Sequence, residues 1–146
     1  MKELGFEIGE TAHTLRRYFD RRAADHGVTR SQWRVLARLE REPGLKQVEL
    51  ADRLDIEPIT LSRIVDRLAD AGLVARERDP DDRRVRRLRL TAEAAPMLEK
   101  LHLVADEVTR EAFAGLDPER LRRLSDTLKI IRANVAAIET DEQVTS

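Results

Sequence analysis

Residues 72–91 read GLVARERDPDDRRVRRLRLT, and this stretch decides the fold of the chain. An apolar start, Leu73-Val74, leads into a charged turn that begins at Asp79-Pro80. Arginines gather in the second half of the stretch, at Arg83, Arg84, Arg86, Arg87 and Arg89. Turn residues between two strand-like runs are typical of a hairpin. The stretch therefore predicts a β-hairpin with a basic tip.

The second half of this hairpin alternates between arginine and leucine. Arg87 and Arg89 alternate with Leu88 and Leu90, which is the period of a strand with one face on the core and the other in water. Arginines near the tip suit a narrow, A·T-rich minor groove, where the negative potential attracts them most. The alternative interpretation is a solubilising edge strand, on which charge prevents aggregation.

Three aspartates, Asp79, Asp81 and Asp82, lie in the same turn. A carboxylate one or two residues before an arginine can hold the guanidinium in one rotamer, which lowers the entropy that is lost on insertion into DNA. The neighbouring arginines keep such carboxylates ionised, so they are poorly suited to act as general acids. We therefore expect these acids to position the arginines.

Two predicted helices, over about 46–54 and 58–71, directly precede the hairpin. Val48 is expected to face inward in the first of them. Pro58 opens the second, and Gly72 supplies the left-handed residue that ends it. An inward stripe leaves one face of the second helix exposed. That face contains Pro58, Ile59, Thr60, Ser62, Arg63, Asp66 and Arg67.

The exposed face of helix 58–71 has the chemistry of a recognition helix, whose N-terminal residues meet base edges. Arg63 suits a bidentate contact to guanine, and Ile59 can touch a thymine methyl. Thr60 and Ser62 can donate or accept hydrogen bonds. The alternative is an ordinary amphipathic helix with a solvated polar face. Together with the hairpin, the helix pair predicts a mainly α protein with a small β-hairpin wing, that is, a winged helix-turn-helix.

Helices are also predicted on both sides of this unit, over 6–26, 30–42, about 92–114 and 118–138. Thr29 and Gln32 form a capping box. Pro96 leaves the exact start of the third of these helices open. Asp117 and Pro118 suit the N-cap and first position of the last helix, and the polar end TDEQVTS is expected to be frayed.

The last helix carries apolar residues at spacings of three and four, which form a heptad seam. The seam residues are Leu121, Leu124, Leu128, Ile131, Val135 and Ile138. One interpretation is core packing within a monomer. We favour a homodimer interface, joined by residues 6–26, because a terminal helix on so small a body has little of its own domain to pack against.

Charge is distributed unevenly over three expected parts: a dimerisation helix at 1–29, a DNA-binding domain at 30–91, and dimerisation helices with a short polar tail at 92–146. The net charge is -1 overall, but residues 30–91 carry fifteen basic and twelve acidic side chains. Residues 92–146 carry seven basic and eleven acidic side chains. The positive excess lies where phosphate is expected, which matters more for double-stranded DNA binding than the total.

The chain has no cysteine, which excludes disulfides and thiolate chemistry. Acidic residues in the N-terminal stretch MKELGFEIGE are unlike a signal peptide, and no apolar run approaches the ~18 residues of a membrane span, so we expect a cytoplasmic protein without membrane contact. The histidines lack metal-ligand spacing, and no catalytic motif is present. We expect no enzyme, no cofactor and no metal site.

These segments resemble the MarR family of bacterial transcription regulators. The resemblance rests on VELADRLDI at 48–56, TLSRIVDRLADAGLV at 60–74 and DPDDRR-x-RRLRLT at 79–91. The phrase TAEAAPML after the wing is similar to the SlyA branch. Two features depart from the family: Lys46 stands where a threonine N-cap is common, and the lack of cysteine excludes the cysteine-sensing branch.

The resemblance implies a homodimeric, winged helix-turn-helix regulator, expected to be a repressor of a pseudo-palindromic operator. By position, Arg84 resembles the wing arginine that enters the minor groove, Asp82 its positioning acid, and Arg63 a DNA-contacting arginine. Arg83, the middle residue of this D-x-R motif, and Arg86, two residues after it, are the other expected DNA-binding residues of the wing. Further implied is a pocket for a small aromatic carboxylate, such as a phenolic acid, that releases the DNA. Its matching positions are His13, Arg16, Ser31 and Trp33.

Two alternatives stay open at this point. For the pocket, Trp33 is instead a core residue and Arg16 a surface residue. For the whole chain, the runner-up is a helical module that binds a protein or RNA without operator specificity. An enzyme is a distant third, and a deep pocket with a strongly shifted acid-base pair would be needed to support it.

Overall fold

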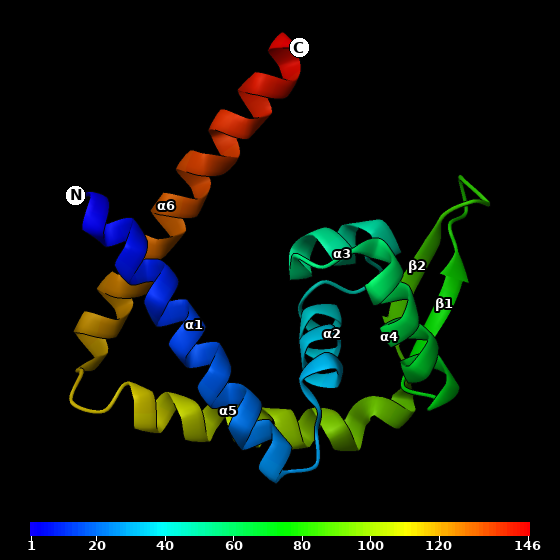
Figure 1. The fold of residues 1–146 in the computed structure, drawn as a ribbon, viewed down its shortest axis with the longest axis horizontal. Coiled ribbons are helices and arrows are strands. Elements are labelled where there is room, and N and C mark those ends of the chain that lie inside the picture. The colour runs from blue at the N-terminus through cyan, green and yellow to red at the C-terminus, as the bar shows by residue number, and fades with distance from the viewer. The chain divides into compact units, whose positions relative to one another are not determined.

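The computed structural model describes all residues, 1–146, and they form two compact units, Met1–Ala112 and Phe113–Ser146. The fold is mainly helical with one two-stranded antiparallel hairpin, which confirms the expected winged helix-turn-helix class (Figure 1). The first unit contains α1 Lys2–Asp25, α2 Arg30–Arg41, α3 Gln47–Leu54, α4 Pro58–Asp70, β1 Val74–Arg78, β2 Arg86–Leu90, a 3-10 turn Ala92–Ala94 and α5 Ala95–Ala112. The second unit contains α6, Pro118–Thr145.

Short-range signals place most helix ends. The Thr29 side chain accepts from the Gln32 N–H at 3.2 Å, and the Gln32 side chain accepts from the Thr29 N–H at 2.9 Å, so the predicted capping box is confirmed. Asp117 likewise caps α6. Lys46 gives α3 no side-chain cap, and its own N–H donates instead to the Glu49 carboxylate at 3.0 Å. Half of a capping box is therefore present there.

The core of the first unit lies where α2, α3, α4 and β2 meet (Figure 1). It is aliphatic, because the chain has few aromatic residues. Its fully buried side chains include Leu36, Leu39, Leu50, Leu61, Val65 and Leu88. Val48 was expected to face this core, but it is 66% exposed. With only eight residues in α3, Leu50, Ala51 and Leu54 already supply the buried face.

The hairpin pairs Val74 with Leu90 at its base and Arg78 with Arg86 next to the turn. A third segment borders β2 on its other side: the Gly44 N–H donates to Leu88 O at 3.0 Å, and the Leu88 N–H donates to Leu45 O at 2.9 Å. Gly44 is buried with a φ of 79°, a conformation that favours glycine. No sequence pattern indicated that the loop after α2 would attach to the wing.

The helix after the wing begins with the 3-10 turn and continues as α5 from Ala95. Pro96 therefore lies in the first turn, where its missing N–H has no partner to lose, which settles the uncertain start. α5 packs against α1 and α2 within the first unit. At the α1 contact, Arg22 donates to the Glu111 carboxylate at 2.6 Å, and Tyr18 donates to the same group.

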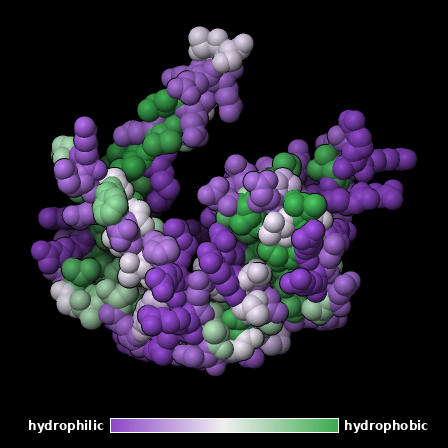
Figure 2. Space-filling view, viewed as in Figure 1, coloured by the Kyte–Doolittle hydropathy of each residue, from purple (hydrophilic) through white to green (hydrophobic).

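The second unit consists of α6 and the short segment before it. α6 continues to Thr145, so the prediction of a frayed end was wrong. The final residues contain no proline or glycine, and Thr140 and Thr145 each donate to the carbonyl four residues earlier. No residue of α6 is buried. Green, apolar side chains follow this helix in Figure 2. No helix of the chain is long and apolar enough to cross a membrane.

Candidate nucleic-acid interface

Helix α4 presents the predicted reading residues on its outer face. Leu61, Val65 and Leu68 are buried, and this fixes the opposite face towards solvent. On that face lie Pro58, Ile59, Thr60, Arg63 and Arg67, all exposed, together with the half-buried Ser62. Ile59, at 66% exposure, is a large apolar side chain without cover. A thymine methyl is the apolar feature that a recognition helix meets in the major groove.

The N-terminal end of α4 is open. Its N-cap, Glu57, makes no side-chain hydrogen bond to the first turn. The first N–H groups of a helix carry a partial positive charge and lack partners within the helix, so they suit a phosphate oxygen. The turn between α3 and α4 is held by α2, because the Arg34 guanidinium of α2 donates a hydrogen bond to Leu54 O at 2.6 Å. Asp55 follows in the left-handed conformation, with a φ of 52°.

The wing is attached to α4 by an ion pair across their surfaces. Arg76 of β1 donates to the carboxylate of Asp66, which lies on the exposed face of α4. A second ion pair spans the hairpin, where Arg89 Nε donates to Glu77 at 2.8 Å. Exposed pairs such as these contribute little free energy each. Their role is geometric, since the first joins the wing to the reading helix.

The turn of the wing is organised around Asp79, which is only 6% exposed. Its Oδ1 accepts the N–H groups of Asp81 at 2.8 Å and Asp82 at 3.1 Å. Its Oδ2 accepts from Arg87 Nε at 2.6 Å. The backbone N–H of Asp81, followed by the Arg87 guanidinium, lowers the pKa of Asp79 against the opposing effect of desolvation. Asp79 is thus an ionised centre of the turn.

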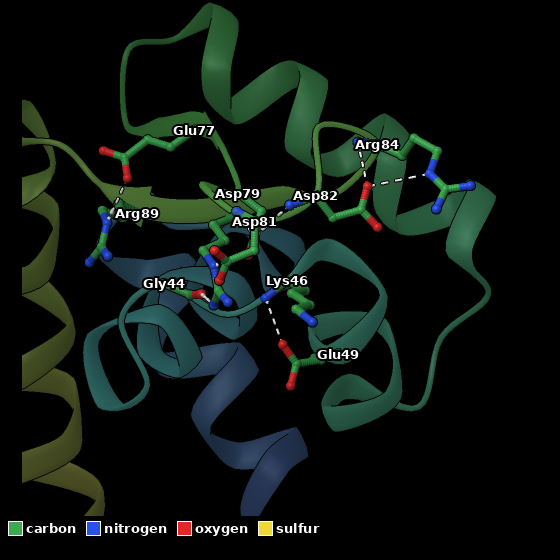
Figure 3. A network of polar contacts seen from close by, with 10 residues as sticks. Gly44, Lys46, Glu49, Glu77, Asp79, Asp81, Asp82, Arg84 and Arg89 are labelled. Atoms are coloured by element: carbon green, nitrogen blue, oxygen red, sulfur yellow. Dashed lines mark hydrogen bonds and ion pairs between the residues drawn. The ribbon is translucent and has the colours of Figure 1, made fainter.

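At the tip, Asp82 and Arg84 form the local pair that the sequence suggested. Asp82 Oδ1 accepts the backbone N–H of Arg84 at 3.0 Å and its Nε at 3.3 Å. Apart from this contact, the Arg84 side chain is 91% exposed, and it extends outward from the wing turn beside Asp82 (Figure 3). Arg83 is exposed, and Arg86 is half-buried, with its guanidinium donating to Arg83 O at 3.2 Å.

Arg87 departs from the simple alternation of β2. It was expected to face water beside Arg89, but its guanidinium is half-buried and bonded to Asp79 and to Gly44 O, the latter at 2.9 Å. Strand periodicity distinguishes the two faces of a hairpin, and the loop after α2 covers part of the outer face here. The only sequence signal for this role was the aspartate eight residues earlier, at the start of the turn.

The four predicted pocket residues are not brought to one place. Arg16 and Trp33 line a hollow of about 590 Å³ between α1, α2, α3 and α5. Arg16 also lines a second hollow of about 390 Å³ together with His13. Ser31 lines a third, of about 170 Å³, near Thr60 at the start of α4. The four residues predicted to form one pocket are therefore distributed over three hollows of the first unit.

Trp33 is both a packing residue and a wall of the hollow that it shares with Arg16. Its ring lies 4.5 Å from that of Phe19, and its Nε1 donates to Asp20 at 2.7 Å. The side chain packs against the core, as the alternative interpretation held. It also borders the hollow, so the two roles are compatible.

Further cations, which no sequence pattern singled out, line the same hollow: Arg34, Arg38, Arg41 and Arg53. Arg38 and Arg53 have an acidic partner in Glu42. Burial, followed by the charges of Arg30 and Arg16, lowers the pKa of Arg34. A site in which cations crowd one another is suited to an anion. No group of three or more histidine, aspartate or glutamate side chains is placed to hold a metal ion.

Comparison with known proteins gives consistent matches. A sequence model of the MarR family matches residues 26–85, the segment from the end of α1 to the wing turn. A MarR transcriptional regulator from Methanosarcina mazei Go1 is 29% identical, with a TM-score of 0.79, over 94% of this chain and 99% of that one. Transcriptional regulator PA3341 is 30% identical, with a TM-score of 0.80, over 92% and 98% of the two chains.

A further match is a solved complex. A mutant MarR from E. coli, complexed with operator DNA, is 25% identical to this chain and has a TM-score of 0.71. The alignment covers 88% of this chain and 93% of that one. The similarity therefore extends over nearly the whole of each relative, beyond the helix-turn-helix alone.

Proposed function

The chain belongs to the MarR family of transcription regulators, and from this premise we propose that it binds a pseudo-palindromic operator as a homodimer and represses transcription. The observation that carries the proposal is the joint placement of two reading elements in one compact unit. These are α4, with its open N-terminus, and a wing whose Arg84 is exposed and paired with Asp82. The DNA complex of the E. coli relative supports the same reading.

In the proposed complex, α4 lies in the major groove and the wing in the adjacent minor groove. Arg63 reads guanine, Thr60 and Ser62 bond to bases or phosphates, and Ile59 meets a thymine methyl. Arg84 enters the minor groove, and Arg83 and Arg86 neutralise phosphates beside it. Phosphate contacts dominate the affinity of such complexes, so binding should weaken steeply as salt rises.

The dimer is proposed from the apolar stripe of α6. Ile131, Val135 and Ile138 are 41%, 50% and 57% exposed, and Leu124 is 45% exposed. Leu121 and Leu128 on the same stripe are half-buried. A heptad stripe of this length is typical of helix pairing between chains. A twofold dimer then requires two half-sites about one helical turn apart.

We also propose a small aromatic carboxylate as the effector, bound in the hollow that Arg16 and Trp33 share. The arginines that line this hollow can form charge-assisted hydrogen bonds to a carboxylate, and the rings of Trp33 and Phe19 can pack against the aromatic part of the ligand. Ser31 and His13 are not needed for this hollow. The segment Thr91–Leu98 favours membership of the SlyA-like branch, and we propose that placement on the sequence pattern alone.

Titration of the purified protein against DNA tests the function. Fluorescence anisotropy would compare the intergenic duplex upstream of its own gene with a random duplex, at two salt concentrations. A complex with the intergenic duplex that is much tighter than with the random duplex is the expected result. No binding to either at low salt would contradict the proposal and favour the alternative, a helical module that binds a protein or RNA.

A further inference from the structure

Arg87 joins three separate segments of the first unit. It lies on β2 opposite Glu77, and its backbone forms a bridge with Lys46 in the loop after α2. Its guanidinium donates through Nε to Asp79 at 2.6 Å and through Nη1 to Gly44 O at 2.9 Å. One planar group therefore connects the strand, the wing turn and the base of the helix-turn-helix.

A continuous series of hydrogen bonds runs from this guanidinium to the wing tip. Asp79 receives Arg87 on one oxygen and the N–H groups of Asp81 and Asp82 on the other. Asp82 in turn receives the backbone N–H and Nε of Arg84. Figure 3 shows these carboxylates following one another along the turn, between Gly44 and Arg84. Arg84 has Asp82 as its side-chain partner, so its position depends on this series.

The chemistry of arginine suits this junction. A guanidinium is a rigid fork that can donate to two acceptors in different directions, whereas an ammonium group is a point charge. Asp79 is 5% exposed at its side chain, while Arg87 is 35% exposed, so the acid is the more deeply placed partner. Removing the cation would leave a nearly buried carboxylate without its counter-charge, and the turn that it organises would loosen.

We infer that Arg87 is a positioning residue for operator binding, which holds the wing turn so that Arg84 meets the minor groove in a preformed orientation. The inference rests on the proposed function of the wing. A preorganised side chain loses less conformational freedom on binding, which raises affinity without a new contact. Because this series of hydrogen bonds begins at Gly44, it also fixes the position of the wing tip relative to the start of α3.

A double-mutant cycle tests this role. Wild type, Arg87→Ala, Arg84→Ala and the double variant would be titrated, at one salt concentration, against a duplex that the wild-type protein has selected from a randomised pool. We expect Arg87→Ala to weaken binding about tenfold when Arg84 is present and less than about twofold when residue 84 is alanine. Such coupling is the readout that a purely structural role would not produce.

Arg89→Ala is the matched control. It removes the same charge from the same strand, but its partner is Glu77 and it makes no hydrogen bond to the turn. Its effect should be the same in both backgrounds. Thermal melting of each variant would show whether it is folded. If Arg87→Ala does not fold, Arg87→Lys takes its place in the cycle, since it keeps the charge but loses the fork.

Three outcomes separate the inference from the function on which it rests. Equal losses for the residue 87 variant in both backgrounds would overturn the inference and leave the wing assignment intact. Arg87→Lys binding as tightly as the wild type would overturn the fork argument, and with it the inference. An Arg84→Ala variant that binds like the wild type would overturn the assignment of Arg84 itself, and the proposed function of the wing with it.

Discussion

Asp82 accepts two hydrogen bonds from Arg84, one from its backbone N–H at 3.0 Å and one from its Nε at 3.3 Å. The guanidinium is thereby directed without being covered, since its side chain remains 91% exposed. An exposed cation at a projecting tip, with only its near neighbour Asp82 as partner, has no packing role to lose. Changes at this residue should therefore affect DNA binding and leave the fold intact.

Arg84→Ala should weaken operator binding by at least about tenfold, about 1.4 kcal/mol, with an unchanged melting temperature. Anisotropy titration at fixed salt measures the first effect and thermal melting the second. Arg110→Ala, which removes one exposed positive charge from α5, is the control for net charge. An unchanged dissociation constant for Arg84→Ala would remove the wing from the binding site.

Arg63 and Arg67 lie one turn apart on the exposed face of α4, and they should behave differently. Arg63→Ala should cost about 1–3 kcal/mol on the selected duplex and relax the preference for one base pair, because a bidentate contact to guanine is lost. Arg67→Ala should weaken all duplexes alike and reduce the salt slope by about one. Selection from a randomised pool with each variant would distinguish the two. Identical consensus sequences for the wild type and Arg63→Ala would contradict the guanine contact.

Leu128→Asp should break the dimer, because it puts a charge into the apolar stripe of α6. The variant is expected to sediment as a single chain of 16.7 kDa, while the wild type sediments at twice that mass. Ala133→Asp adds the same charge to an exposed position on the opposite face of the same helix and should remain dimeric. A dimeric Leu128→Asp variant would show that the seam does not pair the chains.

Asp79 should make the stability of the wing depend on pH. Its pKa in the folded chain lies below the ordinary value of 3.8, first because of the Asp81 N–H and then because of Arg87. A lowered folded pKa gives stability that is present above the unfolded pKa and is lost as pH falls through the folded value. The gap in unfolding free energy between wild type and Asp79→Asn should therefore be constant from about pH 7 to 5 and shrink below about pH 4.

Urea unfolding of both proteins over this range measures the gap directly. Comparing the two proteins cancels the titration of the other acids, including Glu111, whose pKa is also lowered, first by Tyr18. A gap that stays constant down to about pH 2 would show that the pKa of Asp79 is the same in the folded and unfolded states, and it would contradict the lowered pKa.

Local chemistry made most of the fold predictable. The Thr29 capping box, Pro58 at the start of α4 and the heptad stripe of α6 act within one or two helical turns, so the sequence alone reveals them. The tip pair Asp82–Arg84 is likewise a contact between near neighbours. For the same reason, the hairpin and its basic tip could be predicted with their boundaries nearly correct.

Contacts between distant segments were not predictable. Arg87 appeared to be one more solvent-facing arginine, because its partner Gly44 O lies 43 residues away in a loop. Ser31 and Trp33 lie only two positions apart in the sequence but line different hollows, since residues two apart on a helix point in different directions. The walls of the hollow beside Trp33 come from four helices, and only the folded unit brings their cations together.

The single tryptophan of the chain makes the effector proposal testable without DNA. Trp33 lines the hollow with Arg16, and it is the only indole present, so its fluorescence reports on that place alone. Salicylate, as the aromatic carboxylate probe, should change this emission in a saturable way and dissociate the complex with the selected duplex. Arg16→Ala should raise the concentration needed for both effects about tenfold, because a charge-assisted contact is lost. Ser31→Ala should change neither, since Ser31 lines another hollow.

If Ser31→Ala weakened the response as much as Arg16→Ala, the ligand would bind elsewhere. If salicylate changed neither the emission nor the complex, the effector would have to be a different anion or none, while the DNA-binding proposal would stand.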